Sequence, residues 1–267
     1  MRRASDVLLS VVALCAGMAP AAAATPCARP VYLTIDTGHM GVAELVADTL
    51  ARHQVRATFF LANEPTQPAG GRPGGSTLDD HWAAYWKRLA GQGHDFGSHT
   101  WDHAVWRGDR GADGFVMQPT AGARRGQRQT MSAAAYCEQL AMPARRFTEM
   151  TGQPMRALFR APGGRTSPAL LKAAAACGWR HVGWSDAGFL GDELPSDRFS
   201  NQALLEQALR RIRPGDVLMM HLGIWSRQEP WAPAVLEPLI VGLKARGMCF
   251  VTLRDHPDLG RVGAAPG

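Results

Sequence analysis

The sequence predicts an α/β barrel of about seven parallel strands, and three observations support this fold class. Short apolar runs alternate with amphipathic helical stretches, the pattern of a parallel sheet covered by helices. Polar or ionisable residues stand at or near the ends of several short runs, as in a barrel active site. After a signal-like first segment, roughly 240 residues remain, which suits one such domain. No internal repeat or second domain is evident.

The elements follow in a regular order. Strands are predicted at 31–36, 57–62, 95–100, 157–162, 181–186, 216–222 and 249–253. Helices are predicted near 41–53, 79–92, 131–151, 167–177, 200–212 and 233–246, and glycines such as Gly152 and Gly178 follow their ends. The Gly-rich or charged segments 65–77 and 107–129 are too long for ordinary connections. We expect them to be surface loops near the functional rim, or partly disordered.

The first 24 residues resemble a secretory signal. Arg2 and Arg3 precede an apolar stretch from Val7 to Met18, and a small-residue run ends near Ala24. We therefore expect a signal peptide over 1–24 and an exported protein, periplasmic or secreted. The apolar stretch is too short to span a bilayer and no later segment is long enough, so no membrane span is predicted.

The charge of the chain limits its partners. Removal of residues 1–24 takes away two arginines and one aspartate and lowers the formal net charge from +6 to +5. No run of basic residues alternates with aromatic residues, which argues against nucleic acid as a partner. An anionic cell-wall surface or anionic glycan would be attracted, although solubility explains the charge equally well. The oligomeric state is not predicted.

Four cysteines lie beyond the expected signal: Cys27, Cys137, Cys177 and Cys249. An even count in an oxidising compartment permits two disulfides, with three possible pairings. A closed barrel would bring Cys27, before the first strand, close to Cys249 in the last. Cys137 and Cys177 lie on consecutive predicted helices. Buried free thiols are the alternative.

The segment SHTWDH holds His99 and His103 four residues apart, so both imidazoles can bind one metal ion from a single helical turn. This spacing alone is weak evidence. Four further residues end or nearly end the short runs VYLTID, ALFRAP, HVGWSD and DVLMMHL, namely Asp36, Arg160, Asp186 and His221. Together these positions favour a metal-site enzyme.

The motifs TID, HTWDH, FRAPGG and MMHLG, in this order, resemble those of the polysaccharide deacetylase family, also called carbohydrate esterase family 4 or the NodB-homology domain. The resemblance covers 25–267. It implies a distorted (β/α) barrel in which a divalent metal, predicted here as zinc, assists an aspartate base and a histidine acid. Such enzymes remove acetyl groups from amino sugars or, in some members, from acetylated xylan. An acetylated glycan is therefore the expected substrate.

The resemblance also assigns roles to individual residues. Asp36 matches the catalytic base, His99 and His103 the metal ligands, and His221 the general acid. Arg160 matches the arginine that orients the base and keeps it ionised. Asp186 is the predicted partner of His221 because it ends a strand, with Asp192 in the following loop as the second candidate.

Further residues are assigned to substrate binding. Gly163 falls where the family binds the oxyanion through a backbone N–H, and Pro162 precedes it. Trp184 and Leu222 are predicted to line an acetyl or sugar-ring pocket, and Trp225 is a further candidate. Each of these three could instead be ordinary core.

Position 37 departs from the family pattern, which places a second aspartate there as a metal ligand. This chain has Thr37, whose neutral hydroxyl is a poor zinc ligand, and His39 is the nearest imidazole that could substitute. We expect an active deacetylase of an N-acetylated glycan such as peptidoglycan, chitin or poly-N-acetylglucosamine. The competing hypotheses are a non-catalytic glycan-binding homologue with a degenerate metal site, and an amidase acting on a small non-sugar substrate.

Overall fold

The computed structural model describes residues 27–111 and 114–266. Its main sheet is parallel, with the strand order β10-β9-β5-β2-β1-β11, and β12 pairs with the first residues of β1. The strands are β1 (Pro30–Asp36), β2 (Thr58–Leu61), β5 (Asp95–Ser98), β9 (Leu158–Phe159), β10 (Arg180–His181), β11 (Val217–His221) and β12 (Cys249–Phe250). The prediction of a barrel-like sheet of about seven parallel strands is confirmed.

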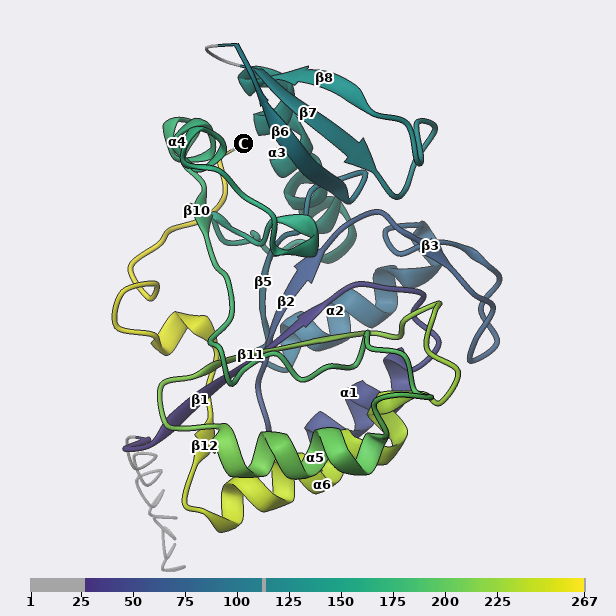
Figure 1. Ribbon diagram of the computed structural model, residues 1–267, viewed down its shortest axis with the longest axis vertical. Coiled ribbons are helices and arrows are strands. Elements are labelled where there is room, and N and C mark those ends of the chain that lie inside the picture. Colours follow the sequence, from purple (N-terminus) through teal and green to yellow (C-terminus); the bar gives the residue numbers. More distant parts are fainter. Residues whose placement is uncertain (1–26, 112–113, 267) are drawn as a thin grey trace, which may run out of the picture.

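Helices connect successive strands and cover the sheet (Figure 1). They are α1 (Ala43–Arg52), α2 (Ala83–Gly91), α3 (Ala133–Thr151), α4 (Pro168–Ala176), α5 (Asn201–Arg211) and α6 (Trp231–Ala245), with short 3-10 turns η1 (Asp80–Trp82), η2 (Pro162–Gly164) and η3 (Leu253–Asp255). Three begin at a serine whose hydroxyl accepts a hydrogen bond from a backbone N–H: Ser132, Ser167 and Ser200. All three of these helices, α3, α4 and α5, lie where the sequence predicts a helix.

Strand β1 pairs with three other strands, β2, β11 and β12. Every residue from Val31 to Asp36 is buried, as expected of a parallel strand that is covered on both faces. Strand β2 pairs with one edge of β1 and β11 with the other. The end of β1 is therefore flanked by the ends of two neighbours.

The chain that follows β10 brings the two edges of the sheet toward each other. Strand β10 stops at His181, so the strand predicted at 181–186 is mostly absent. The chain then runs along β11 at the opposite edge, where Ser185 N donates to Val217 O (3.0 Å) and Phe189 forms a parallel bridge with Met219. This crossing makes the sheet a curled, incompletely hydrogen-bonded barrel.

The segment 107–129 is only partly the loop that the sequence predicts. Residues 107–110, 114–119 and 129 belong to a three-stranded antiparallel sheet of β6 (Ala104–Arg110), β7 (Gly114–Pro119) and β8 (Gln129–Ser132), which lies beside α3 at one end of the molecule (Figure 1). Alternate residues of β7 are buried, including Phe115 and Met117. This period of two is the pattern of a strand covered on one face, and the surrounding arginines and glycines obscure it. The segment 65–77 contains only the short pair β3 (Pro65–Thr66) and β4 (Gly75–Ser76).

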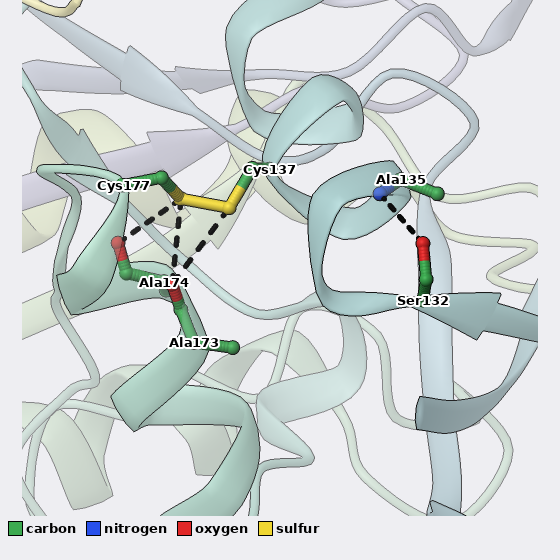
Figure 2. Close-up of a disulfide and its surroundings, with 6 residues drawn as sticks. All are labelled: Ser132, Ala135, Cys137, Ala173, Ala174 and Cys177. Atoms are coloured by element: carbon green, nitrogen blue, oxygen red, sulfur yellow. Dashed lines mark hydrogen bonds between the residues drawn. A yellow bond between two sulfur atoms is a disulfide. The ribbon is translucent and has the colours of Figure 1, made fainter. Parts of the chain in front are cut away.

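Two disulfides connect distant parts of the chain. Cys27 pairs with Cys249 at a Cα–Cα distance of 6.0 Å, which joins the start of the described chain to β12. Cys137 pairs with Cys177 at 6.2 Å and connects α3 to the end of α4 (Figure 2). The four cysteines are therefore disulfide-bonded and not free thiols.

The expected signal peptide over 1–24 lies outside the described residues. Within 27–111 and 114–266, no helix is both long enough and apolar enough to cross a membrane.

The Cys137–Cys177 disulfide closes a long loop across the two helices. Replacing both cysteines with serine should lower the free energy of unfolding by about 2–4 kcal/mol, because the cross-link restricts the unfolded chain. Urea unfolding of the variant and the oxidised wild type would measure this difference. Equal unfolding midpoints and slopes would show that the disulfide contributes no stability.

Candidate active site at the carboxyl ends of the strands

Four predicted site residues meet at one edge of the parallel sheet. Asp36 ends β1 and is the direct register partner of His221, which ends β11. His99 follows β5, and Arg160 follows β9. Because parallel strands all end on the same side, polar residues at their carboxyl ends converge there. The four residues predicted at or near strand ends therefore lie together on this side of the sheet.

Arg160 and Asp36 form an ion pair inside the barrel. The Arg160 side chain has no exposed surface, and its Nη1 donates to Asp36 Oδ1 at 2.8 Å. Its other nitrogens donate to the carbonyl oxygens of Val182 (3.3 Å) and Gly183 (3.0 Å). Burial alone would raise the pKa of Asp36, but Arg160, with smaller contributions from His99 and His221, holds the pKa below its ordinary value. Asp36 is therefore an ionised carboxylate in a buried position.

His99 presents one ring nitrogen to Asp36. Its Nδ1 lies 2.9 Å from the carbonyl oxygen of Arg160, which can only accept, so Nδ1 carries the proton. Burial lowers the pKa of His99 to about 4, and the ring is neutral near pH 7. Nε2 therefore has a free lone pair and lies 3.6 Å from Asp36 Oδ2. A histidine that ligates a metal commonly has its other nitrogen bound in this way.

His103 lies beside His99, with 4.8 Å between the ring centroids. The two are carried by a turn after β5 and not by the predicted helical turn. Thr100 and His103 have positive φ angles of 60° and 47°, which are uncommon for residues with a side chain. His103 Nδ1 lies 2.5 Å from the hydroxyl of Thr120, just beyond β7. The small antiparallel sheet thus supports one of the two imidazoles.

The partner of His221 is Asp192 and not the predicted Asp186. Asp192 Oδ1 lies 3.1 Å from His221 Nδ1, and Oδ2 accepts from the backbone N–H of His221 at 2.7 Å. Asp186 is exposed, because the chain leaves β10 early and reaches β11 only at 185–190. Asp192 follows that contact directly. Burial would lower the pKa of His221, but Asp192, assisted by Asp36 and Glu193, raises it to about 9.

Glu64 was not identified from the sequence. It follows β2, and its Oε2 accepts a hydrogen bond from the Thr37 hydroxyl at 2.5 Å. His39, predicted as a possible substitute ligand, lies toward β11: its backbone N–H donates to Gly223 O (3.1 Å), and its ring contacts Trp225. The carboxylate beside Thr37 thus comes from the residues that follow β2. No pattern of apolar residues in the sequence indicates this position.

The predicted substrate-binding residues differ in exposure. Gly163 is exposed and has a φ of 63°, whereas Pro162 is buried. Trp184 is partly exposed and packs against Gly164 and the Arg160 guanidinium. Leu222 is fully buried in the hydrophobic core, so its side chain supports the site from beneath and offers no surface to a substrate.

Comparison with known proteins identifies the family. The family model described as polysaccharide deacetylase matches residues 23–182, more than half of the chain. The chain belongs to the polysaccharide deacetylase family. Among curated relatives, it is 24% identical to a chitooligosaccharide deacetylase of Azorhizobium caulinodans over 84% of this chain and 92% of the relative. It is 23% identical to the peptidoglycan-N-acetylmuramic acid deacetylase of Bacillus subtilis over 85% of this chain and 71% of that protein.

Solved structures of the same family share the fold. A family 4 acetyl xylan esterase from Clostridium thermocellum, in complex with a cobalt ion, matches with a TM-score of 0.64 and 23% identity over 88% of this chain and 93% of the other. A family 4 pseudoenzyme from Bacillus anthracis matches with a TM-score of 0.60 and 20% identity over 85% and 65%. The polysaccharide deacetylase fold is therefore shared by active and inactive proteins, and activity depends on the site.

The site contains part of a metal-binding set. The neighbouring imidazoles of His99 and His103, each with Nδ1 in contact with an oxygen atom, are a donor pair suited to zinc or a similar divalent ion. Over the described ranges, however, no three His, Cys, Asp or Glu side chains stand together as a complete metal cluster. The two histidines fit a metal, and a third ligand is missing at Thr37.

The contact between Asp192 and His221 can be tested by titration. We expect Asp192→Asn to lower the pKa of His221 from about 9 by about 1 to 3 pH units, since an adjacent carboxylate stabilises the imidazolium. Asp186→Asn removes the same charge from the exposed position and should leave this pKa unchanged. NMR titration of the histidine rings would measure both. The assignment fails if the two variants shift the pKa of His221 equally.

Proposed function

We propose that the protein is a metal-dependent deacetylase that hydrolyses N-acetyl groups of a glycan. The main support is the pairing of an ionised carboxylate with a protonated imidazole at register-matched strand ends, Asp36 and His221, beside the two metal-suited histidines. A base and an acid with opposite protonation states at neutral pH are what amide hydrolysis needs.

Asp36 would act as the general base. Its Oδ1 is held by Arg160, and its Oδ2 faces the His99 ring. A water molecule beside Oδ2 would give its proton to this carboxylate as it attacks the acetyl carbonyl. Arg160 keeps the carboxylate ionised and in one orientation. Because the guanidinium is also bound to two backbone carbonyls, the base cannot turn away from the site.

His221 would act as the general acid. Its Nδ1 contacts Asp192, which leaves Nε2 to give a proton to the departing amine nitrogen. The pKa of about 9 keeps the ring protonated in neutral solution. Asp192 also accepts from the backbone of His221, so a single carboxylate fixes both the charge and the position of the acid.

The metal would be held by His99 and His103, and zinc is proposed because imidazole nitrogen suits it. When bound, such an ion polarises the carbonyl and lowers the pKa of water, which assists the base. His99 is prepared for this role, since burial keeps it neutral and the Arg160 carbonyl orients its ring.

The proposed substrate class is an acetylated amino-sugar polymer such as peptidoglycan, chitin or poly-N-acetylglucosamine. The names of the two curated relatives describe them as deacetylases of peptidoglycan and of chitooligosaccharides. We also propose export to the periplasm or the exterior, following the signal-like segment 1–24. Two disulfides are consistent with an oxidising compartment.

A non-catalytic glycan-binding protein is the second candidate. Thr37 favours it, because the metal ligand set is incomplete there, and the likeness to a pseudoenzyme shows that this fold exists without activity. The buried Asp36–Arg160 pair and the Asp192–His221 pair argue against it. Burying ionised groups costs free energy, and binding a glycan requires neither pair.

The two candidates differ in acetate release. With zinc supplied, the protein should release acetate from chitin oligomers or peptidoglycan, and Asp36→Asn and His221→Ala should each reduce turnover by about 10² to 10⁴. Turnover should fall as the pH rises through about 9, where His221 loses its proton. Acetate quantification across pH, with folding checked by circular dichroism, would measure this.

Two results would reject the deacetylase proposal. One is no acetate release from any N-acetylated glycan by the zinc-loaded protein, with glycan binding retained. The other is wild-type turnover in both variants.

A further inference from the structure

The histidine pair needs a carboxylate to complete a common catalytic zinc set, two histidines and one acidic residue. Three carboxylates belong to the site. Asp36 Oδ2 is 3.6 Å from His99 Nε2, Glu64 is hydrogen-bonded to Thr37 next to Asp36, and Glu193 lies beside His221. The contacts of each carboxylate decide which one is free to bind the metal.

Two of these carboxylates have other partners. Asp36 is bound by Arg160, and a carboxylate held in that ion pair is committed to its role as base. Glu193 lies beside the proposed general acid: its Oε2 is 3.9 Å from His221 Nε2, and its side chain is 45% exposed. Glu193 is therefore associated with His221 and partly open to solvent.

Glu64 has a different position. Strand β2 lies between β1 and β5, so the residues after β2 lie between Thr37 and His99. The backbone of Glu64 is fixed by Thr77, whose hydroxyl accepts from Glu64 N (3.2 Å) and whose N–H donates to Glu64 O (2.9 Å). Among the described residues, the side chain has no hydrogen-bond partner besides Thr37.

The Thr37 hydroxyl orients this carboxylate. It accepts a hydrogen bond from the backbone N–H of Ala62 (3.1 Å), so its own proton points to Glu64 Oε2 (2.5 Å). Thr37 has no carboxylate of its own, but its hydroxyl holds the carboxylate of Glu64 beside it. An oxygen ligand from a neighbouring strand would replace the missing carboxylate at position 37 without changing the charge of the site.

We propose that Glu64 is the third protein ligand of the metal, with Thr37 as the residue that positions it. This inference rests on the proposed metal-dependent function and names a ligand that motif comparison alone does not reveal. The ligand set is then His99, His103 and Glu64, which leaves Asp36 free to act as base.

The test is zinc affinity, measured by competition with a chromogenic chelator on the purified protein. Loss of a residue that only supports a ligand costs about 10–100-fold in affinity, so Glu64→Gln, which loses a ligand, should cost more than about 100-fold. Thr37→Val should cost about 10-fold, and Thr37→Ser should bind as the wild type does. Glu193→Gln is the matched control and should keep the wild-type affinity, although it removes the same charge.

A compensating variant makes the test independent of folding. In the Glu64→Gln background, Thr37→Asp should restore most of the lost affinity, because it returns a carboxylate to the same space. The His99→Ala/His103→Ala variant sets the lower limit of binding.

Three results would overturn the proposal. The first is wild-type affinity in Glu64→Gln, and the second is an equal loss in Glu64→Gln and Glu193→Gln, which would indicate a general effect of charge. If the wild type still binds zinc and releases acetate in either case, the deacetylase function stands without Glu64. The third is a wild type that binds no stoichiometric zinc, which would reject the metal-dependent mechanism as well.

Discussion

The ion pair between Arg160 and Asp36 is the interaction on which the site depends. A fully buried guanidinium crosses the interior of the curled sheet from β9 to β1 and also binds the carbonyls of the chain that follows β10. Removing two charges from water is costly, and the direct hydrogen bonds must compensate for this cost. The pair therefore fixes the Asp36 carboxylate, the proposed base, and it holds the end of β1 against the segment that closes the sheet.

The other functional groups are arranged around this pair. The backbone carbonyl of Arg160 orients His99, and the strand partner of Asp36 is His221. The site thus contains two pairs of opposite charge: the Asp36 carboxylate held by Arg160, and the protonated His221 imidazole held by Asp192. Asp36 and His221 are register partners on adjacent strands, which would let both act on one bond in the proposed hydrolysis.

The sequence predicts the features that depend on strand ends. Asp36, His99, Arg160 and His221 lie together because apolar runs that end in polar residues form parallel strands with a common edge. Asp186 was predicted as the partner of His221, with Asp192 second, and this order was wrong because the position of Asp192 depends on a chain crossing that no local pattern encodes. Glu64 was missed for a similar reason. It reaches Thr37 only because β2 inserts between β1 and β5, an order set by the whole fold.

A double-mutant cycle on the free energy of unfolding tests the central role of the buried pair most directly. Arg160→Met alone should cost about 3–5 kcal/mol, since it leaves the Asp36 carboxylate buried without a counter-charge. Adding Asp36→Asn removes that charge, and the double variant should recover most of the loss. If the double variant is destabilised by the sum of the two single substitutions, the residues are not energetically coupled and the account is contradicted.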